Sequence, residues 1–233
     1  MASRFAGLRR VRQGVSPLVI LFFVALAGAA PVGSSALAQS LEQQIDSALK
    51  PASQPDQQPG VTRGLGVTRG LSDTKSDDEQ RFIDRLRSRA IAVEPTQPGA
   101  AEDRHKIAEI IMGKPQIDLE IYFDYDSAVV GPKALPALVA LGNVLSKPDY
   151  RSTVFFINGF TDARGGADYN LRLSQRRAEA VRRVLIEQFG LSPDTLISTG
   201  FGKELLKFPE QPFADQNRRV QIVNTEQKAS AGR

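Results

Sequence analysis

The residues best suited to chemistry in this chain are an aspartate and an arginine, Asp162 and Arg177. Asp162 closely follows an apolar, strand-like stretch. Gly165 and Gly166 come next and let the backbone approach a ligand closely. A carboxylate binds an ammonium group, and the planar fork of arginine matches a carboxylate with two hydrogen bonds. The pair therefore suits a ligand with both charges, and pairing of the two side chains with each other is the structural alternative.

Arg177 differs from the neighbouring arginines in its place on the helix predicted for residues 168–189. On a helical wheel, the core face and the solvated face are separate: the first holds Leu171, Ala178, Val181 and Leu185, the second Arg172, Arg176 and Arg183. Arg177 lies with Asn170 and Ser174 at the edge of the inward face. Such a helix, polar first and apolar later, lines a pocket at its N-terminal end, where free N–H groups favour an anion. We expect one arginine of this helix to face inward.

The elements that must position this pair form a regular series from about residue 106. Alternating and apolar runs predict strands, and leucines at helical spacing after Pro132 predict a helix, as does the 168–189 stretch ended by Gly190. The expected order is strand 119–123, helix 132–147, strand 153–158, helix 168–189 with Asp168 as N-cap, strand 195–201 and strand 219–223. This order predicts an α/β (α+β) sandwich, βαβαββ, with the helices on one side of a mixed sheet.

Composition argues against several classes of function. The 233 residues contain no cysteine and one histidine, His105, so thiolate metal sites, multi-histidine metal sites and ordinary thiol or histidine catalysis lack their parts. A hydrolase that uses only carboxylates, Asp124, Asp126 and Asp162, remains the enzymatic alternative. Four of the 30 basic residues lie in the first forty positions, which leaves 26 against 26 acidic residues and no nucleic-acid footprint. We expect no enzyme activity, cofactor or metal.

The N-terminal region reads as a secretory signal peptide over residues 1–38. Four arginines precede an apolar stretch, and Ala36-Leu37-Ala38 fits the small-x-small cleavage pattern, with Gln39 as the new N-terminus. The alternative is an uncleaved anchor in the inner membrane. Residues 39–105 are rich in Pro, Gln, Ser and Gly and repeat a hexamer at 60–71, which predicts a low-complexity, disordered linker. Short helices are expected at 41–49 and 77–89, and a disordered tail at 226–233.

Several motifs of the C-terminal half together resemble a known family. They are Tyr122–Ser127, Gly159–Asp162, Tyr169-Asn170, Leu173-Ser174, Arg177-Ala178 and Asn217–Val220. These residues resemble the OmpA-like C-terminal domain, a peptidoglycan-binding module, over about residues 117–225, and we place the domain at 106–225. The family usually has histidine where this chain has Phe160, so the packing at the rim of the site is expected to differ. The chain also lacks the lipid-attachment cysteine of the peptidoglycan-associated lipoproteins.

The resemblance implies a ligand and the residues that hold it. Asp162 and Arg177 would hold the D-amino-acid end of meso-diaminopimelate in the peptidoglycan stem peptide. Asn170, Thr161 and Asp126 would line the site. Arg219 either contacts the glycan or peptide or braces the last strand.

The function expected from these observations is non-catalytic binding of peptidoglycan. The protein would be exported to the periplasm and tethered to the cell wall or outer membrane, with residues 39–105 available to an envelope protein partner. The alternative is a stator-like or scaffold protein anchored in the inner membrane and using the same domain. A proton-channel stator needs an acidic residue in its membrane helix, and residues 13–40 contain none.

Overall fold

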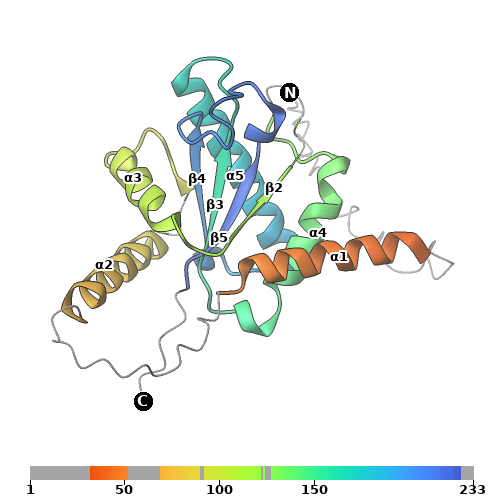
Figure 1. The fold of residues 1–233 in the computed structure, drawn as a ribbon, viewed down its shortest axis with the longest axis horizontal. Coiled ribbons are helices and arrows are strands. Elements are labelled where there is room, and N and C mark those ends of the chain that lie inside the picture. The colour runs from red at the N-terminus through yellow and green to blue at the C-terminus, as the bar shows by residue number, and fades with distance from the viewer. Residues whose placement is uncertain (1–31, 52–68, 90–91, 122, 124–126, 227–233) are drawn as a thin grey trace, which may run out of the picture.

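A mixed five-stranded sheet organises the protein. The structure is a computed structural model, and it describes residues 32–51, 69–89, 92–121, 123 and 127–226. The strand order is β1-β4-β3-β5-β2, with β3 parallel to β4, β4 parallel to β1, and β5 antiparallel to both β3 and β2 (Figure 1). The strands are β1 (Ala92–Val93), β2 (Gln116–Leu119), β3 (Phe155–Phe160), β4 (Leu196–Gly202) and β5 (Val220–Asn224).

Five α-helices accompany this sheet in the described residues. They are α1 (Val32–Leu49), α2 (Arg69–Ser88), α3 (Ala100–Ile111), α4 (Leu135–Leu145) and α5 (Ala167–Phe189). From β2 onward the order is β2, α4, β3, α5, β4, β5, so the predicted βαβαββ sandwich is confirmed. Most boundaries lie within two residues of the prediction, which is the usual uncertainty of helix and strand ends.

The first strand of this series lies further upstream than predicted. β2 ends at Leu119, which pairs with Val220, the first residue of β5. Beyond Leu119 the chain has no residue of β5 left to pair with, so the strand expected at 119–123 occupies 116–119 instead. Helix α5 begins at Ala167 with Gly166 as N-cap, rather than at Asp168, and Gly190 ends it in a left-handed conformation as expected.

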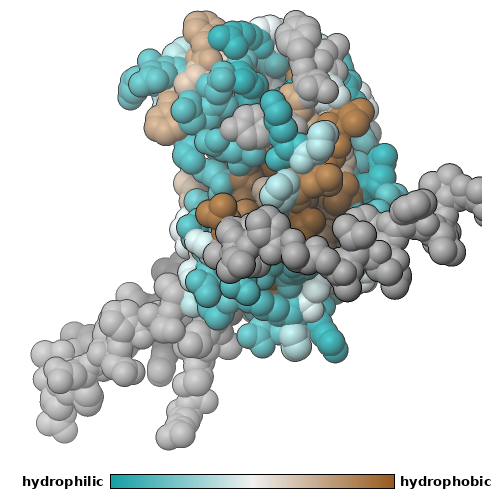
Figure 2. Space-filling view, turned by 90° about the vertical axis from the view of Figure 1, so that its right-hand side faces the viewer, coloured by the Kyte–Doolittle hydropathy of each residue, from teal (hydrophilic) through white to brown (hydrophobic). Residues whose placement is uncertain are grey.

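Both faces of the sheet are covered, and two apolar clusters fill the interfaces. One cluster joins α4, α5 and α1 to side chains such as Phe155 and Ile222. The other joins α2 and α3 to the opposite face, at Phe156 and Phe201. The two helices of the predicted βαβαββ unit, α4 and α5, lie on one side of the sheet as expected, together with α1, whereas α2 and α3 cover the second face. Seen from the side of α4, hydrophobic residues gather within a largely hydrophilic surface (Figure 2).

The segment expected to be a disordered linker contains ordered helices in its described parts. The short helix expected at 41–49 lies within α1, and the one expected at 77–89 lies in α2 except for its last residue, because α2 ends at Ser88. The two helices bury Ile45, Leu49, Ile83 and Leu86. The apolar face of each helix therefore packs against the core. The sequence gives little indication of this long-range contact, because the segment as a whole is polar. The first hexamer, most of the signal sequence and residues 227–233 lie outside the described residues. In the part described, no helix is long and apolar enough to cross a bilayer.

Helix α5 lies unusually close to the sheet at two glycines. A Cβ at Gly159 would overlap the carbonyl oxygen of Ser174, and one at Gly200 would overlap the backbone nitrogen of Gln175. The contact is also polar, because the Gln175 side chain accepts a hydrogen bond from the N–H of Gly200 and the Ser174 hydroxyl accepts one from Gly202. These contacts fix the first half of α5 over the ends of β3 and β4.

Candidate functional site

Asp162 lies just beyond the carboxyl end of β3, close to the start of α5. Its side chain is buried, with a residue exposure of 5%. Oδ1 accepts a hydrogen bond from the N–H of Arg164 at 3.0 Å, and Oδ2 forms ion pairs with Arg218 at 2.9 Å and Arg164 at 3.3 Å. The carboxylate is thus held in one orientation by two arginines.

Arg177 is buried on the inner face of α5, as predicted, with a residue exposure of 7%. Its Nε donates a hydrogen bond to the carbonyl oxygen of Ser127 at 3.0 Å, and its Cζ lies 4.9 Å from the centre of the Phe123 ring. Burial lowers the pKa of Arg177, and the nearby charge of Arg218 lowers it further, while Asp162 raises it. Burial and the charge of Arg218 disfavour the charged guanidinium, so an anion placed beside Arg177 would be favoured.

Within the described residues, Asp162 and Arg177 are not paired with each other. The ion pairs of Asp162 are those with Arg164 and Arg218. For Arg177, the acceptor in the described part is the Ser127 carbonyl, at Nε. The structural alternative, in which the two side chains form one internal salt bridge, is therefore absent from this part of the chain.

Two further predicted site residues lie around the same loop. The Nδ2 of Asn170, in the first turns of α5, donates a hydrogen bond to the carbonyl oxygen of Arg164 at 2.7 Å and so closes the 162–166 loop. The N–H of Thr161 donates to the carbonyl oxygen of Gly202 at 2.8 Å. The Thr161 hydroxyl is buried, and no partner for it lies among the described residues. Asp126 lies outside the described residues.

Comparison with known proteins identifies the family of the domain that carries these residues. The sequence model of the OmpA family matches residues 122–220. This part of the chain is an OmpA family domain. Helices α1, α2 and α3 and strands β1 and β2 precede the matched residues.

Several relatives contain similar sequence. A peptidoglycan-associated lipoprotein of Pseudomonas aeruginosa is 40% identical over 104 residues, which cover 43% of this chain and 59% of the relative. The probable lipoprotein YiaD of Escherichia coli is 31% identical over 153 residues, 62% of this chain and 60% of the relative. A crystal structure of the peptidoglycan-associated lipoprotein from Burkholderia pseudomallei is 36% identical and covers 45% of this chain and 87% of that one, with a TM-score of 0.39. The chain thus spans about three-fifths of the first curated relatives.

Arg219 of the OmpA-like domain is held by the protein itself. Its Nε pairs with Asp118 of β2 at 3.2 Å, and its terminal nitrogens donate to the carbonyl oxygens of Asn217 and Leu205. Its Cζ lies 3.8 Å from the centre of the Phe160 ring. Of the two predicted roles of Arg219, bracing the last strand is the one these contacts favour, while ligand binding by Arg219 remains a prediction.

Phe160, at the usual position of a histidine, has a packing role. Its ring stacks on that of Phe201, with centres 5.4 Å apart and an angle of 9° between the planes, and Arg219 lies against it. Both rings are buried in the cluster on the face of the sheet that α2 and α3 cover. The substitution therefore changes the support of the site and leaves the ion pairs of Asp162 in place.

The arginines of α5 divide as predicted, with one exception. Arg172, Arg176 and Arg183 are exposed, whereas Arg177 is buried. Arg182 is also buried, so the expectation of a single inward arginine was wrong. Its Nε and Nη2 donate to the carbonyl oxygens of Leu196 and Pro193, at the start of β4. Arg182 thus serves the fold, at the opposite end of α5 from Asp162.

Sequence reasoning missed the arginines that hold Asp162. Arg218 lies in the same Asn217–Val220 motif as Arg219. The motif itself, which carries part of the family resemblance, was the one usable signal for Arg218. Arg164 offered no such signal, because a loop arginine is usually solvated.

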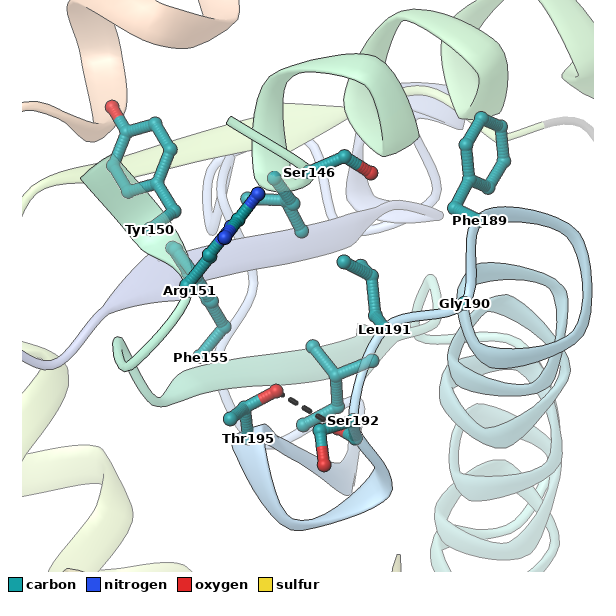
Figure 3. Close-up of a pocket in the computed structure, with 11 residues that line it drawn as sticks. Ser146, Tyr150, Arg151, Phe155, Phe189, Gly190, Leu191, Ser192 and Thr195 are labelled. Atoms are coloured by element: carbon teal, nitrogen blue, oxygen red, sulfur yellow. Dashed lines mark hydrogen bonds between the residues drawn. The ribbon is translucent and has the colours of Figure 1, made fainter. Parts of the chain in front are cut away.

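A separate cavity of about 320 Å³ lies at the other end of the domain (Figure 3). It is lined by the ends of α4 and α5 and the starts of β3 and β4, including Ser146, Arg151, Phe155, Phe189 and Leu191. None of the predicted site residues lines it. No group of potential metal ligands occurs among the described residues.

Proposed function

We propose that this protein binds peptidoglycan without catalysing a reaction, by holding the diaminopimelate of the stem peptide between Asp162 and Arg177. The observation that carries the proposal is the pair of buried opposite charges at one end of the sheet, unpaired with each other in the described chain. Buried charges require partners. The carboxylate of such a ligand would supply one to Arg177, and its ammonium would take the acceptor position of Asp162 that Arg164 and Arg218 leave open. The OmpA family match and the peptidoglycan-associated relatives support peptidoglycan binding, and diaminopimelate is the part of it that the proposal adds.

Arg177 is the group proposed to bind the carboxylate of diaminopimelate. Its Nε is occupied by the Ser127 carbonyl, which fixes the plane of the guanidinium. The terminal nitrogens are then oriented for a bidentate contact with a carboxylate, the geometry for which arginine is suited. The N-terminal turns of α5 add a favourable dipole on the same side.

Asp162 is the group proposed to bind the ammonium of diaminopimelate. A carboxylate offers about four acceptor positions. The N–H of Arg164 and the guanidinium groups of Arg164 and Arg218 use three of them. One position is left for an ammonium donor. Arg218 and Arg164 thus orient Asp162 and do not need to be displaced.

The cellular setting is proposed from the sequence. Residues 1–38 would direct export to the periplasm, and the OmpA-like domain would tether the protein to the wall. Since α1, α2 and α3 pack on the domain, an envelope partner of residues 39–105 would meet the outer faces of these helices. The cellular location is tested by measuring the mass of the protein recovered from periplasmic and membrane fractions. A chain that begins at Gln39 supports export with cleavage. An intact chain in the inner membrane supports the anchored alternative.

The binding proposal is tested by calorimetric titration of the full chain with a stem peptide that contains meso-diaminopimelate. We expect Asp162→Asn and Arg177→Ala each to weaken binding about tenfold or more, because each removes one charge-assisted contact worth about 1.5–3 kcal/mol. Arg172→Ala is the matched control, because Arg172 is exposed on the same helix. Unchanged affinity in both site variants would refute the proposal.

A second ligand assigns the carboxylate to Arg177 itself. A stem peptide with lysine in place of diaminopimelate keeps the ammonium and lacks the carboxylate. We expect the wild-type protein to bind it about as weakly as Arg177→Ala binds the diaminopimelate peptide. The Arg177→Ala substitution should then cause little further loss with the lysine peptide. An equal loss with both peptides would place the carboxylate elsewhere.

A further inference from the structure

Exposed aromatic rings lie beside the proposed peptide site. Phe213 has an exposure of 55% and Tyr169 of 39%. The Cζ of Arg164 lies 5.9 Å from the centre of the Phe213 ring, and the same guanidinium pairs with Asp162 at 3.3 Å. The ring of Phe213 is thus separated from the proposed ammonium-binding carboxylate by one arginine side chain.

The backbone that carries Phe213 is fixed, although its ring is exposed. The N–H of Ala163 donates to the carbonyl oxygen of Pro212 at 2.9 Å, which ties the loop directly to the residue after Asp162. Asn217 is fully buried beneath the loop: its Oδ1 accepts a hydrogen bond from the N–H of Phe208, and its Nδ2 donates to the carbonyl oxygen of Gln211. An aromatic ring on a pinned loop is preorganised for contact, because little freedom is lost on binding.

Tyr169 and two cations complete the mouth of the site. Tyr169 lies against Gly165, where a Cβ would be 3.6 Å from the tyrosine ring. Lys203 donates a hydrogen bond to the carbonyl oxygen of the same glycine at 3.0 Å. The mouth therefore combines aromatic faces with the N–H donors of Arg164 and Lys203. Saccharides need this combination, since the C–H faces of a pyranose ring stack on aromatic rings and its hydroxyl and acetamido oxygens accept hydrogen bonds.

We propose that Phe213, flanked by Tyr169 and Arg164, forms a second subsite that stacks on the glycan of peptidoglycan. The inference rests on the proposed function, because the stem peptide is what brings the glycan to this place. Diaminopimelate is the third residue of the stem, so only two residues and the diaminopimelate side chain separate its bound D-amino-acid end from the sugar. A peptide held between Asp162 and Arg177 thus has its sugar within reach of the neighbouring rings.

The test compares two ligands by calorimetry on the full chain: the free stem tetrapeptide with meso-diaminopimelate, and the same peptide attached to its N-acetylated disaccharide. We expect the wild-type protein to bind the disaccharide peptide about two- to tenfold more tightly, the range typical of one aromatic contact. Phe213→Ala and Phe213→Leu should abolish this gain and leave the affinity for the free peptide unchanged. Phe213→Trp should retain the gain, because it keeps an aromatic face.

Three results would overturn the inference. Equal affinity of the wild-type protein for the two ligands would mean that the glycan makes no contact. An equal loss for both ligands in Phe213→Ala would mean that Phe213 supports the peptide site or the fold, and retention of the gain in Phe213→Leu would exclude stacking. Failure of the wild-type protein to bind the free peptide would instead refute the proposed function, and the glycan subsite with it.

Discussion

Helix α1 offers a direct test of whether the segment before the OmpA-like domain belongs to its core. Leu49 ends this helix with no exposed surface, inside the cluster formed by α4, α5 and the sheet. Its carbonyl oxygen also accepts a hydrogen bond from the Nδ2 of Asn224 in β5, at 2.9 Å. We therefore predict that Leu49→Ala destabilises the whole domain.

The size of the effect follows from complete burial. Replacing a buried leucine by alanine removes the transfer free energy of the side chain and leaves a cavity, which costs about 2–5 kcal/mol. For a protein of this size, each kcal/mol lowers the melting temperature by about 2–4 °C. A loss of about 3 kcal/mol would therefore lower it by about 6–12 °C.

The assay is urea unfolding followed by far-ultraviolet circular dichroism. The matched control is Gln43→Ala, because Gln43 lies on the same helix, within the chain that begins at Gln39, and is exposed. We expect the control to change the free energy of unfolding by less than about 0.5 kcal/mol. If Leu49→Ala and Gln43→Ala unfold at the same urea concentration, α1 is a linker and its packing on the core is refuted.

Three further predictions concern the supports of the site. Burial raises the pKa of Asp118, but the hydrogen bond from Lys207 and the charge of Arg219 lower it below its usual 3.8. Asp118→Asn should therefore lower the free energy of unfolding by about 1–3 kcal/mol at pH 7. Since a lowered carboxyl pKa stabilises the fold above the unfolded pKa, this cost should shrink as the pH falls below about 4 in urea titrations. Phe160→His should destabilise the stack under Arg219 by about 0.5–2 kcal/mol, and more below about pH 6.5, where an imidazolium would face a guanidinium. Asn217→Ala removes the hydrogen bonds that pin the 208–214 loop, and limited proteolysis should cleave that loop faster.

Each of these predictions has a result that contradicts it. For Asp118→Asn, it is a loss of stability that is the same at pH 7 and pH 3. For Phe160→His, it is a cost that does not vary between pH 8 and pH 5.5. For Asn217→Ala, it is an unchanged cleavage rate in the 208–214 loop.

The sequence by itself determined the order of elements and the inward face of α5. Both are local signals: apolar residues recur with the period of a strand or a helix, and Gly190 ends the helix within the same window. The position of Arg177 on the helix was sufficient to predict its burial. The motifs around Asp162 were sufficient to predict the OmpA family.

Only the tertiary structure decided which charges meet. Asp162 pairs with Arg218, 56 residues later. This is possible because β5 runs antiparallel beside β3, so that the start of β5, just after Arg218, lies beside the end of β3. The place of α1 was decided in the same way, since its apolar stripe gains its partners from α4 and β2. Periodicity predicts which side chains point inward. Their contact partners are determined by strand order and helix packing, which depend on contacts between residues far apart in the chain.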